Sequence, residues 1–92
     1  MTQNNAIAID YTDQQLRVFV EEYIIQQRGT FTVQGACSYV LYWAMEDGHT
    51  TCTGLYDGNQ LCAADCQRVS NVLQMIVREG RIAADGDKYK KV

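Results

Sequence analysis

The hydrophobic positions between residues 62 and 79 recur every three or four residues, as they do along one face of an amphipathic helix. These positions are Val69, Val72, Leu73, Ile76 and Val77. Gly80 follows where a helix end commonly needs a positive φ angle, and Arg78 complements the helix dipole just before it. The pattern predicts a helix over residues 62–79 with one apolar and one polar face.

The chain after Gly80 has two short segments of strand length separated by a turn signal. Residues 81–84 and 88–92 flank Asp85-Gly86-Asp87, and Asp-Gly between short runs is a strong signal for a β-hairpin. We therefore expect an antiparallel pair of strands at the end of the chain.

Two further helices are expected upstream, over residues 12–28 and 33–47. The first has an apolar stripe, with Thr12 as its N-cap, Gln15 completing an approximate capping box, and Arg28-Gly29 at its end. The second is apolar around much of its circumference. Such a helix either lies within the core or presents Tyr39, Tyr42 and Trp43 to a partner.

The segments between these helices have weaker patterns. Thr30 to Val33 alternates β-branched and aromatic residues, which favours a short strand over 30–33 beside the hairpin. Residues 48–61 are rich in glycine and threonine and are typical of a loop or irregular ribbon, although Leu55 to Cys62 is also compatible with a short helix. Residues 1–10 are expected to be a flexible terminus, and residues 11–92 a single domain.

Three runs near the end of the chain carry a resemblance to a known fold. The runs Val69–Leu73, Ile76–Ile82 and Asp85–Tyr89 resemble the recognition helix and wing of winged helix-turn-helix DNA-binding domains. This resemblance implies an α+β, mainly helical fold in which the strand at 30–33 completes a three-stranded sheet. Most such domains are transcriptional regulators, and some bind proteins instead.

The polar residues on the predicted recognition helix and hairpin have the chemistry to bind duplex DNA. Arginine can pair with guanine, asparagine and glutamine can pair with adenine, and lysines on a wing can contact phosphates. The helix contributes Gln67, Arg68, Ser70, Asn71, Gln74 and Arg78, and the hairpin contributes Arg81, Lys88, Lys90 and Lys91. A plain solvated helix face and a lysine-protected edge strand would show similar residues.

The net charge of −3 is unfavourable for binding a polyanion. The distribution of the charge is less unfavourable for DNA binding. Residues 1–50 carry six carboxylates and two arginines, whereas residues 51–92 carry five carboxylates and six basic side chains. A DNA-binding protein with so small a surplus would need to dimerise for useful affinity. The alternative is a protein-interaction module, an adaptor or inhibitor, that binds through its acidic first half. Either reading allows a homodimer through Tyr39, Tyr42 and Trp43.

His49, Cys52, Cys62 and Cys66 supply one imidazole and three sulfurs within eighteen residues, enough in number for a tetrahedral metal site. Their spacing does not match the paired Cys-x2-Cys pattern of structural zinc sites, so no metal is predicted. Cys37 and Cys66 are expected to be buried, inert thiols.

Several other functional classes lack support in the sequence. A single histidine, with no phosphate-binding glycine loop and no nucleophile motif, gives no basis for an enzyme or a cofactor site. No apolar run is long enough to cross a bilayer, and residues 1–10 do not resemble a signal peptide, so we expect a cytoplasmic protein.

Overall fold

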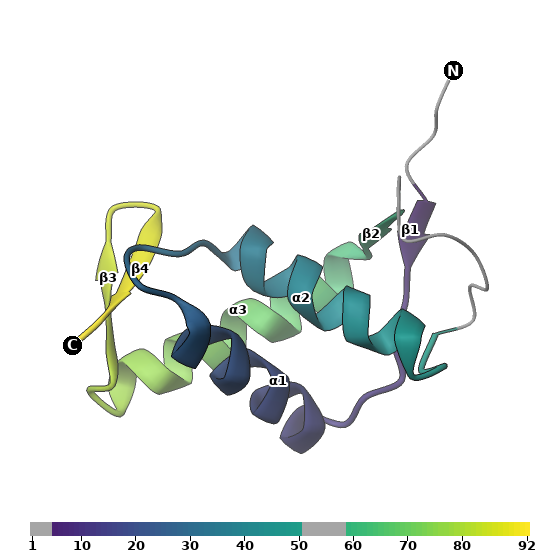
Figure 1. Cartoon of the computed structure of the whole chain (residues 1–92), viewed down its shortest axis with the longest axis horizontal. Helices are drawn as coiled ribbons and strands as arrows, with labels where there is room; N and C mark the ends of the chain where they lie inside the picture. Colours follow the sequence, from purple (N-terminus) through teal and green to yellow (C-terminus); the bar gives the residue numbers. More distant parts are fainter. Residues whose placement is uncertain (1–4, 51–58) are drawn as a thin grey trace.

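Three helices form the body of the protein in the computed structural model, which describes residues 5–50 and 59–92. They are α1 (Asp13–Gln26), α2 (Val33–Glu46) and α3 (Ala63–Arg78), and each packs against the other two. In the view of Figure 1, α3 lies behind α1 and α2. A parallel strand pair stands at one end of the bundle and an antiparallel hairpin at the other (Figure 1). The expected mainly helical α+β architecture, with three helices and a small antiparallel sheet, is confirmed.

The core forms where the apolar stripes of the helices meet. From α3 come Val69, Val72, Leu73 and Ile76, which are all buried, as the periodicity predicted. The other two helices contribute Leu16, Val20, Ile24, Ala36, Cys37, Val40, Leu41 and Ala44. Burial of these side chains supplies most of the driving force for folding, at about 25 cal/mol per Å² of apolar surface.

Local hydrogen bonds set the start of α1 where it was expected. The Thr12 hydroxyl accepts a hydrogen bond from the backbone N–H of Gln15, and the Gln15 side chain accepts one from the N–H of Thr12. The capping box is therefore complete. The helix ends earlier than predicted, because Gln27 adopts an extended conformation and Gly29 has no positive φ angle. Residues 27–30 instead lead the chain toward the hairpin.

The end of α3 follows the sequence pattern closely. Gly80 has a φ of 79°, its N–H bonds to the carbonyl of Val77, and the N–H of Arg81 bonds to the carbonyl of Ile76. This is the Schellman arrangement, which satisfies carbonyls left open at a helix end. The chain then enters the hairpin of β3 (Ile82–Asp85) and β4 (Lys88–Lys91), connected by Gly86 and Asp87.

The predicted strand over 30–33 is shorter than expected. Only Phe31 pairs with the hairpin, exchanging two backbone hydrogen bonds of 2.8 Å with Tyr89 in an antiparallel bridge. The reason is that α2 begins at once, since the Thr32 hydroxyl caps it by accepting from the N–H of Gly35. Phe31 therefore makes alone the pairing with the hairpin that was predicted for the four residues 30–33.

A second strand pair was not predicted. β1 (Asn5–Ile7) runs parallel to β2 (Asn59–Leu61), and Ile7 and Ile9 are buried. Residues 5–10 are thus part of the folded body rather than a flexible segment, while residues 1–4 lie outside the described residues. The alternative helix over Leu55–Cys62 is wrong for its second half, which is extended. Its first half falls on residues 51–58, which are also outside the described part.

The positive φ of Gly80 gives a test of this architecture. A Cβ at Gly80 would meet no atom within 4 Å, so Gly80→Ala should cost only the conformational penalty, about 1–2 kcal/mol of unfolding free energy. Gly29→Ala is the matched control: its Cβ also meets nothing, but its φ is not positive, so it should be neutral or stabilise by up to about 1 kcal/mol. Urea unfolding of the three proteins measures both values, and equal stability of the two variants would contradict the assigned geometry.

Candidate nucleic-acid interface

The outward face of α3 carries an uninterrupted stripe of hydrogen-bonding side chains. Gln67, Asn71, Gln74 and Arg78 are all exposed, and their spacing of three or four residues aligns them along the helix. The Gln67 amide donates to the Asn71 side-chain oxygen at 3.0 Å. Ser70 lies at the flank and is half-buried. Most of the predicted helix contacts are therefore available to a ligand.

Arg68 does not belong to this stripe, contrary to the sequence prediction. Its guanidinium donates to Asp65 at 2.8 Å, to Asp13 at 3.2 and 3.1 Å, and to the backbone carbonyl of Tyr11. The physical reason is its place on the helix: position 68 lies on the flank that faces α1, three residues after Asp65. The Asp-x-x-Arg spacing is the signal that sequence reasoning passed over.

Asp65 is the one buried acidic residue in the described part of the chain, and it was not singled out from sequence. Its carboxylate accepts from the N–H of Ile9 at 3.0 Å and from the Cys62 thiol at 3.1 Å, besides Arg68. Burial acts to raise the pKa of Asp65, but these three donors outweigh it, so the pKa is lowered. Asp65 is therefore a charged anchor between α3 and the segment that follows β1.

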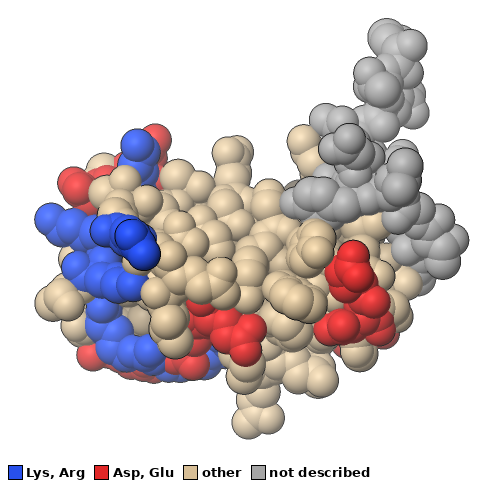
Figure 2. Space-filling model, viewed as in Figure 1, with Lys and Arg blue, Asp and Glu red and all other residues tan. Residues whose placement is uncertain are grey.

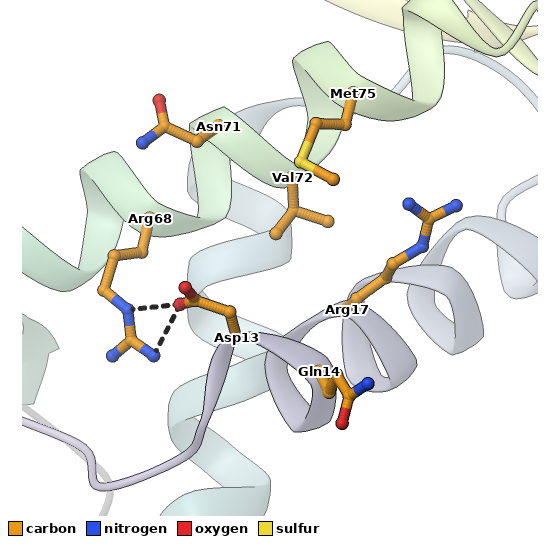
Figure 3. A pocket seen from close by; sticks show the side chains of 7 residues that line it. All are labelled: Asp13, Gln14, Arg17, Arg68, Asn71, Val72 and Met75. Carbon is orange, nitrogen blue, oxygen red and sulfur yellow. Dashed lines mark hydrogen bonds and ion pairs between the residues drawn. The ribbon is translucent and has the colours of Figure 1, made fainter.

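Figure 3 shows the groove between α1 and α3 in which Arg68 meets Asp13. Its lining also includes Arg17, Val72 and Met75. Arg17 forms ion pairs with Glu21 and Glu79. Its hydrogen bond to Glu79 holds the pKa of Glu79 below its usual value. The charged side chains along this groove, Asp13, Arg17 and Arg68, are thus ion-paired within the protein.

The basic residues of the hairpin differ in availability. Lys88 and Lys90 are exposed, and the structure shows no ion pair for either among the described residues. Arg81 pairs with Glu21 and lies 3.9 Å from Glu79, while the Lys91 ammonium donates to the carbonyl of Ile25 at 3.0 Å. Arg81 and Lys91 are therefore partly committed to holding the hairpin against α1.

The charged side chains are separated along the molecule. On the face in Figure 2, the basic side chains gather at the end that carries the hairpin, with a few carboxylates among them, and the charged side chains visible toward the opposite end are acidic. Within the described ranges, three arginines are ion-paired, namely Arg17, Arg68 and Arg81. On this face, the net charge of −3 therefore coexists with a cluster of basic side chains at the hairpin end.

The histidine and cysteines do not form a metal site in the described residues, where no three ligating side chains converge. His49 lies 2.7 Å from the Asp10 carboxylate and packs on the Tyr11 ring, and Cys62 donates to Asp65. Cys66 is half-buried rather than buried, with its thiol directed at the carbonyl of Leu61. Cys52 lies outside the described residues.

Cys37 is buried, as predicted. Burial and the neighbouring Cys66 thiol raise the pKa of Cys37, which disfavours the reactive thiolate. Its burial is thus confirmed, and the expectation that this thiol is inert remains a prediction.

Comparison with known proteins adds no identification, because no family, no curated protein and no solved structure matches this chain. Within residues 5–50 and 59–92, none of the helices has the length and apolar character needed to cross a membrane.

The lowered pKa of Asp65 predicts an acid-sensitive contribution to stability. Because its folded pKa lies below the unfolded value, the contribution is complete above about pH 4 and is lost as the pH falls through the folded value. Asp65→Asn should remove this part of the pH dependence and lower stability near neutrality. Urea midpoints between pH 2 and 6 measure it, with the exposed Asp85→Asn as the control. Parallel pH profiles for the protein and Asp65→Asn would contradict the assignment.

Proposed function

We propose that the protein is a small winged-helix DNA-binding protein, acting as a transcriptional regulator, with α3 in the major groove and the hairpin against the backbone. The order of elements supports the winged-helix reading: α1, the bridging Phe31, α2, α3 and then a hairpin whose second strand pairs with Phe31. The long connection between α2 and α3 and the parallel pair β1–β2 are additions to that plan.

The observation that carries the proposal is the charge character of the α3 stripe. Gln67, Asn71, Gln74 and Arg78 present amides and one guanidinium, with no carboxylate among them. The acidic residue within α3 and the one that caps its end are both engaged inside the protein, because Asp65 is buried and Glu79 pairs with Arg17. A helix face that donates and accepts hydrogen bonds without negative charge suits the edges of bases.

The free cations extend this surface toward the hairpin. Arg78, Lys88 and Lys90 make no ion pair in the described part of the chain. Each contact of this type with a phosphate releases a counterion, so it adds affinity for any sequence. We propose that the stripe supplies the sequence preference and the lysines the general affinity.

A substitution on the stripe tests the proposal. Asn71→Ala should reduce discrimination between the preferred duplex and others by about 1–3 kcal/mol, or roughly 5- to 150-fold. Lys88→Ala should weaken binding to all duplexes alike and lower the slope of log affinity against log salt by about one.

The measurement is a fluorescence anisotropy titration against a preferred duplex, selected from random pools, and a scrambled one at two salt concentrations. Gln34→Ala, an exposed amide on α2, is the control and should change neither quantity. The proposal fails if no duplex binds at 150 mM salt, or if Asn71→Ala leaves the discrimination unchanged.

A second candidate function is a protein-interaction module, favoured by the outer face of α2. Tyr42 is 44 % exposed and Trp43 is 37 % exposed. Their rings lie 5.4 Å apart at nearly right angles, and Tyr39 is 6.4 Å from Trp43. Aromatic side chains of this kind are enriched at interfaces, and a second copy of the chain would suit the dimer that DNA binding needs.

The aromatic face predicts an effect on self-association. If it is a dimer interface, Trp43→Ala should weaken the dimer by about 2 kcal/mol or more, as substitution of a central aromatic anchor does. Sedimentation velocity over a concentration series measures the change. Met75→Ala removes an apolar side chain of similar exposure, 45 %, from a different helix and should leave association unchanged. A monomer at all concentrations in the unsubstituted protein would rule out the dimer and leave only a foreign partner for this face.

A further inference from the structure

A small hollow lies where the segment after α1 passes the last strand, β4. It is lined by Arg28, Gly29, Thr30, Lys90 and Lys91. The two segments meet because Phe31 and Tyr89 form an antiparallel bridge, so the chain leading back to residue 28 passes beside the chain leading on to residue 91. Residues more than sixty positions apart in the sequence thus form one concave surface at the basic end of the molecule.

The hollow has an uncompensated positive charge. Of the five described residues that line it, three are cations and none is acidic. Among the described residues, neither Arg28 nor Lys90 forms an ion pair, in contrast to Arg17, Arg68 and Arg81. Cations gathered around a concavity focus a positive potential and raise the local concentration of anions.

A purely structural role accounts for part of this arrangement. Because α1 has no basic residue in its last turn, the Lys91 ammonium, which donates to the carbonyl of Ile25, takes over the stabilisation of that helix end. This explains Lys91 alone. The Arg28 guanidinium and the Lys90 ammonium have no acceptor in the described structure, and Lys91 has two further N–H donors.

We propose that this hollow binds a phosphate group, held by the Arg28 guanidinium and the Lys90 ammonium, with the Thr30 hydroxyl and Lys91 as additional donors. Planar guanidinium groups match the oxygens of a phosphate, and ammonium groups add point charges. In the proposed DNA complex, on which this part of the inference rests, the group is a phosphodiester of the duplex backbone. Inorganic phosphate is the other source of the same chemistry.

The first experiment uses inorganic phosphate as the probe and does not involve DNA. Backbone amide NMR shifts are followed during titration with phosphate, with sodium chloride at equal ionic strength as the reference. Saturable shifts should be confined to residues 28–30 and 90–91 in the unsubstituted protein. They should weaken at least severalfold in Arg28→Ala and in Lys90→Ala.

Arg17→Gln is the matched control, because it removes the same charge from an arginine that is already ion-paired. Its titration should resemble that of the unsubstituted protein. Shifts that chloride reproduces, or that Arg28→Ala leaves unchanged, overturn the proposal. The same spectra show whether each variant is folded.

The second experiment identifies the source of the phosphate. In duplex titrations over a range of salt, Arg28→Ala should weaken binding to preferred and scrambled duplexes by the same factor and lower the salt slope by about one, whereas the α2 control Gln34→Ala should not. If duplexes bind but Arg28→Ala has no effect on the slope, the phosphodiester assignment is wrong and the proposed function stands. If phosphate saturates the hollow but no duplex binds, the DNA-binding function is wrong and free phosphate is the ligand.

Discussion

The structure depends on one buried carboxylate. Burying an ionised Asp65 would cost several kcal/mol unless its oxygens were satisfied, and here donors from three places satisfy them: the N–H of Ile9, the Cys62 thiol and the Arg68 guanidinium. Asp65 also lies in the first turn of α3, where the helix dipole favours a negative charge. The Arg68 guanidinium that pairs with Asp65 also donates to Asp13 and to the carbonyl of Tyr11. The Asp65–Arg68 pair therefore also fixes where the chain enters α1.

This anchor also determines what α3 presents to solvent. The Asp65–Arg68 pair occupies the flank of the helix, so the polar residues that remain outside are uncharged apart from Arg78. At the far end of α3, Glu79 pairs with Arg17 of α1, and Arg81 pairs with Glu21 of α1. Those pairs are partly exposed and each contributes little to stability. They nevertheless neutralise two carboxylates, Glu21 and Glu79, at that end of α3.

The elements that could be predicted from sequence are those encoded by local signals. The period of the α3 core residues, the glycine at position 80 and the Asp-Gly turn each act within a few residues, and each is where it was expected. The β1–β2 pair has no such signal, because two three-residue strands separated by about fifty residues are too short to show a pattern. The types of residue in the site could be predicted, but the contacts that each one makes could not. Arg68 has the chemistry of a base-reading residue, and only the structure shows that it pairs with Asp13 and Asp65 instead. Arg28 was missed because the Phe31–Tyr89 bridge alone brings it to the hairpin.

That bridge has a mechanical consequence. The hairpin is attached to the bundle at its base, through the turn at Gly80, and at its side, through the two hydrogen bonds and the stacked rings of Phe31 and Tyr89. Together with the contacts of Arg81 and Lys91 to α1, these attachments leave the hairpin little freedom to move relative to the helices. The spacing between the outer face of α3 and the lysines of β4 is therefore set before any ligand arrives. For a duplex bound as proposed, the nucleic acid would have to supply whatever bending the fit requires, and sequences that deform easily would be preferred even at base pairs that no side chain touches.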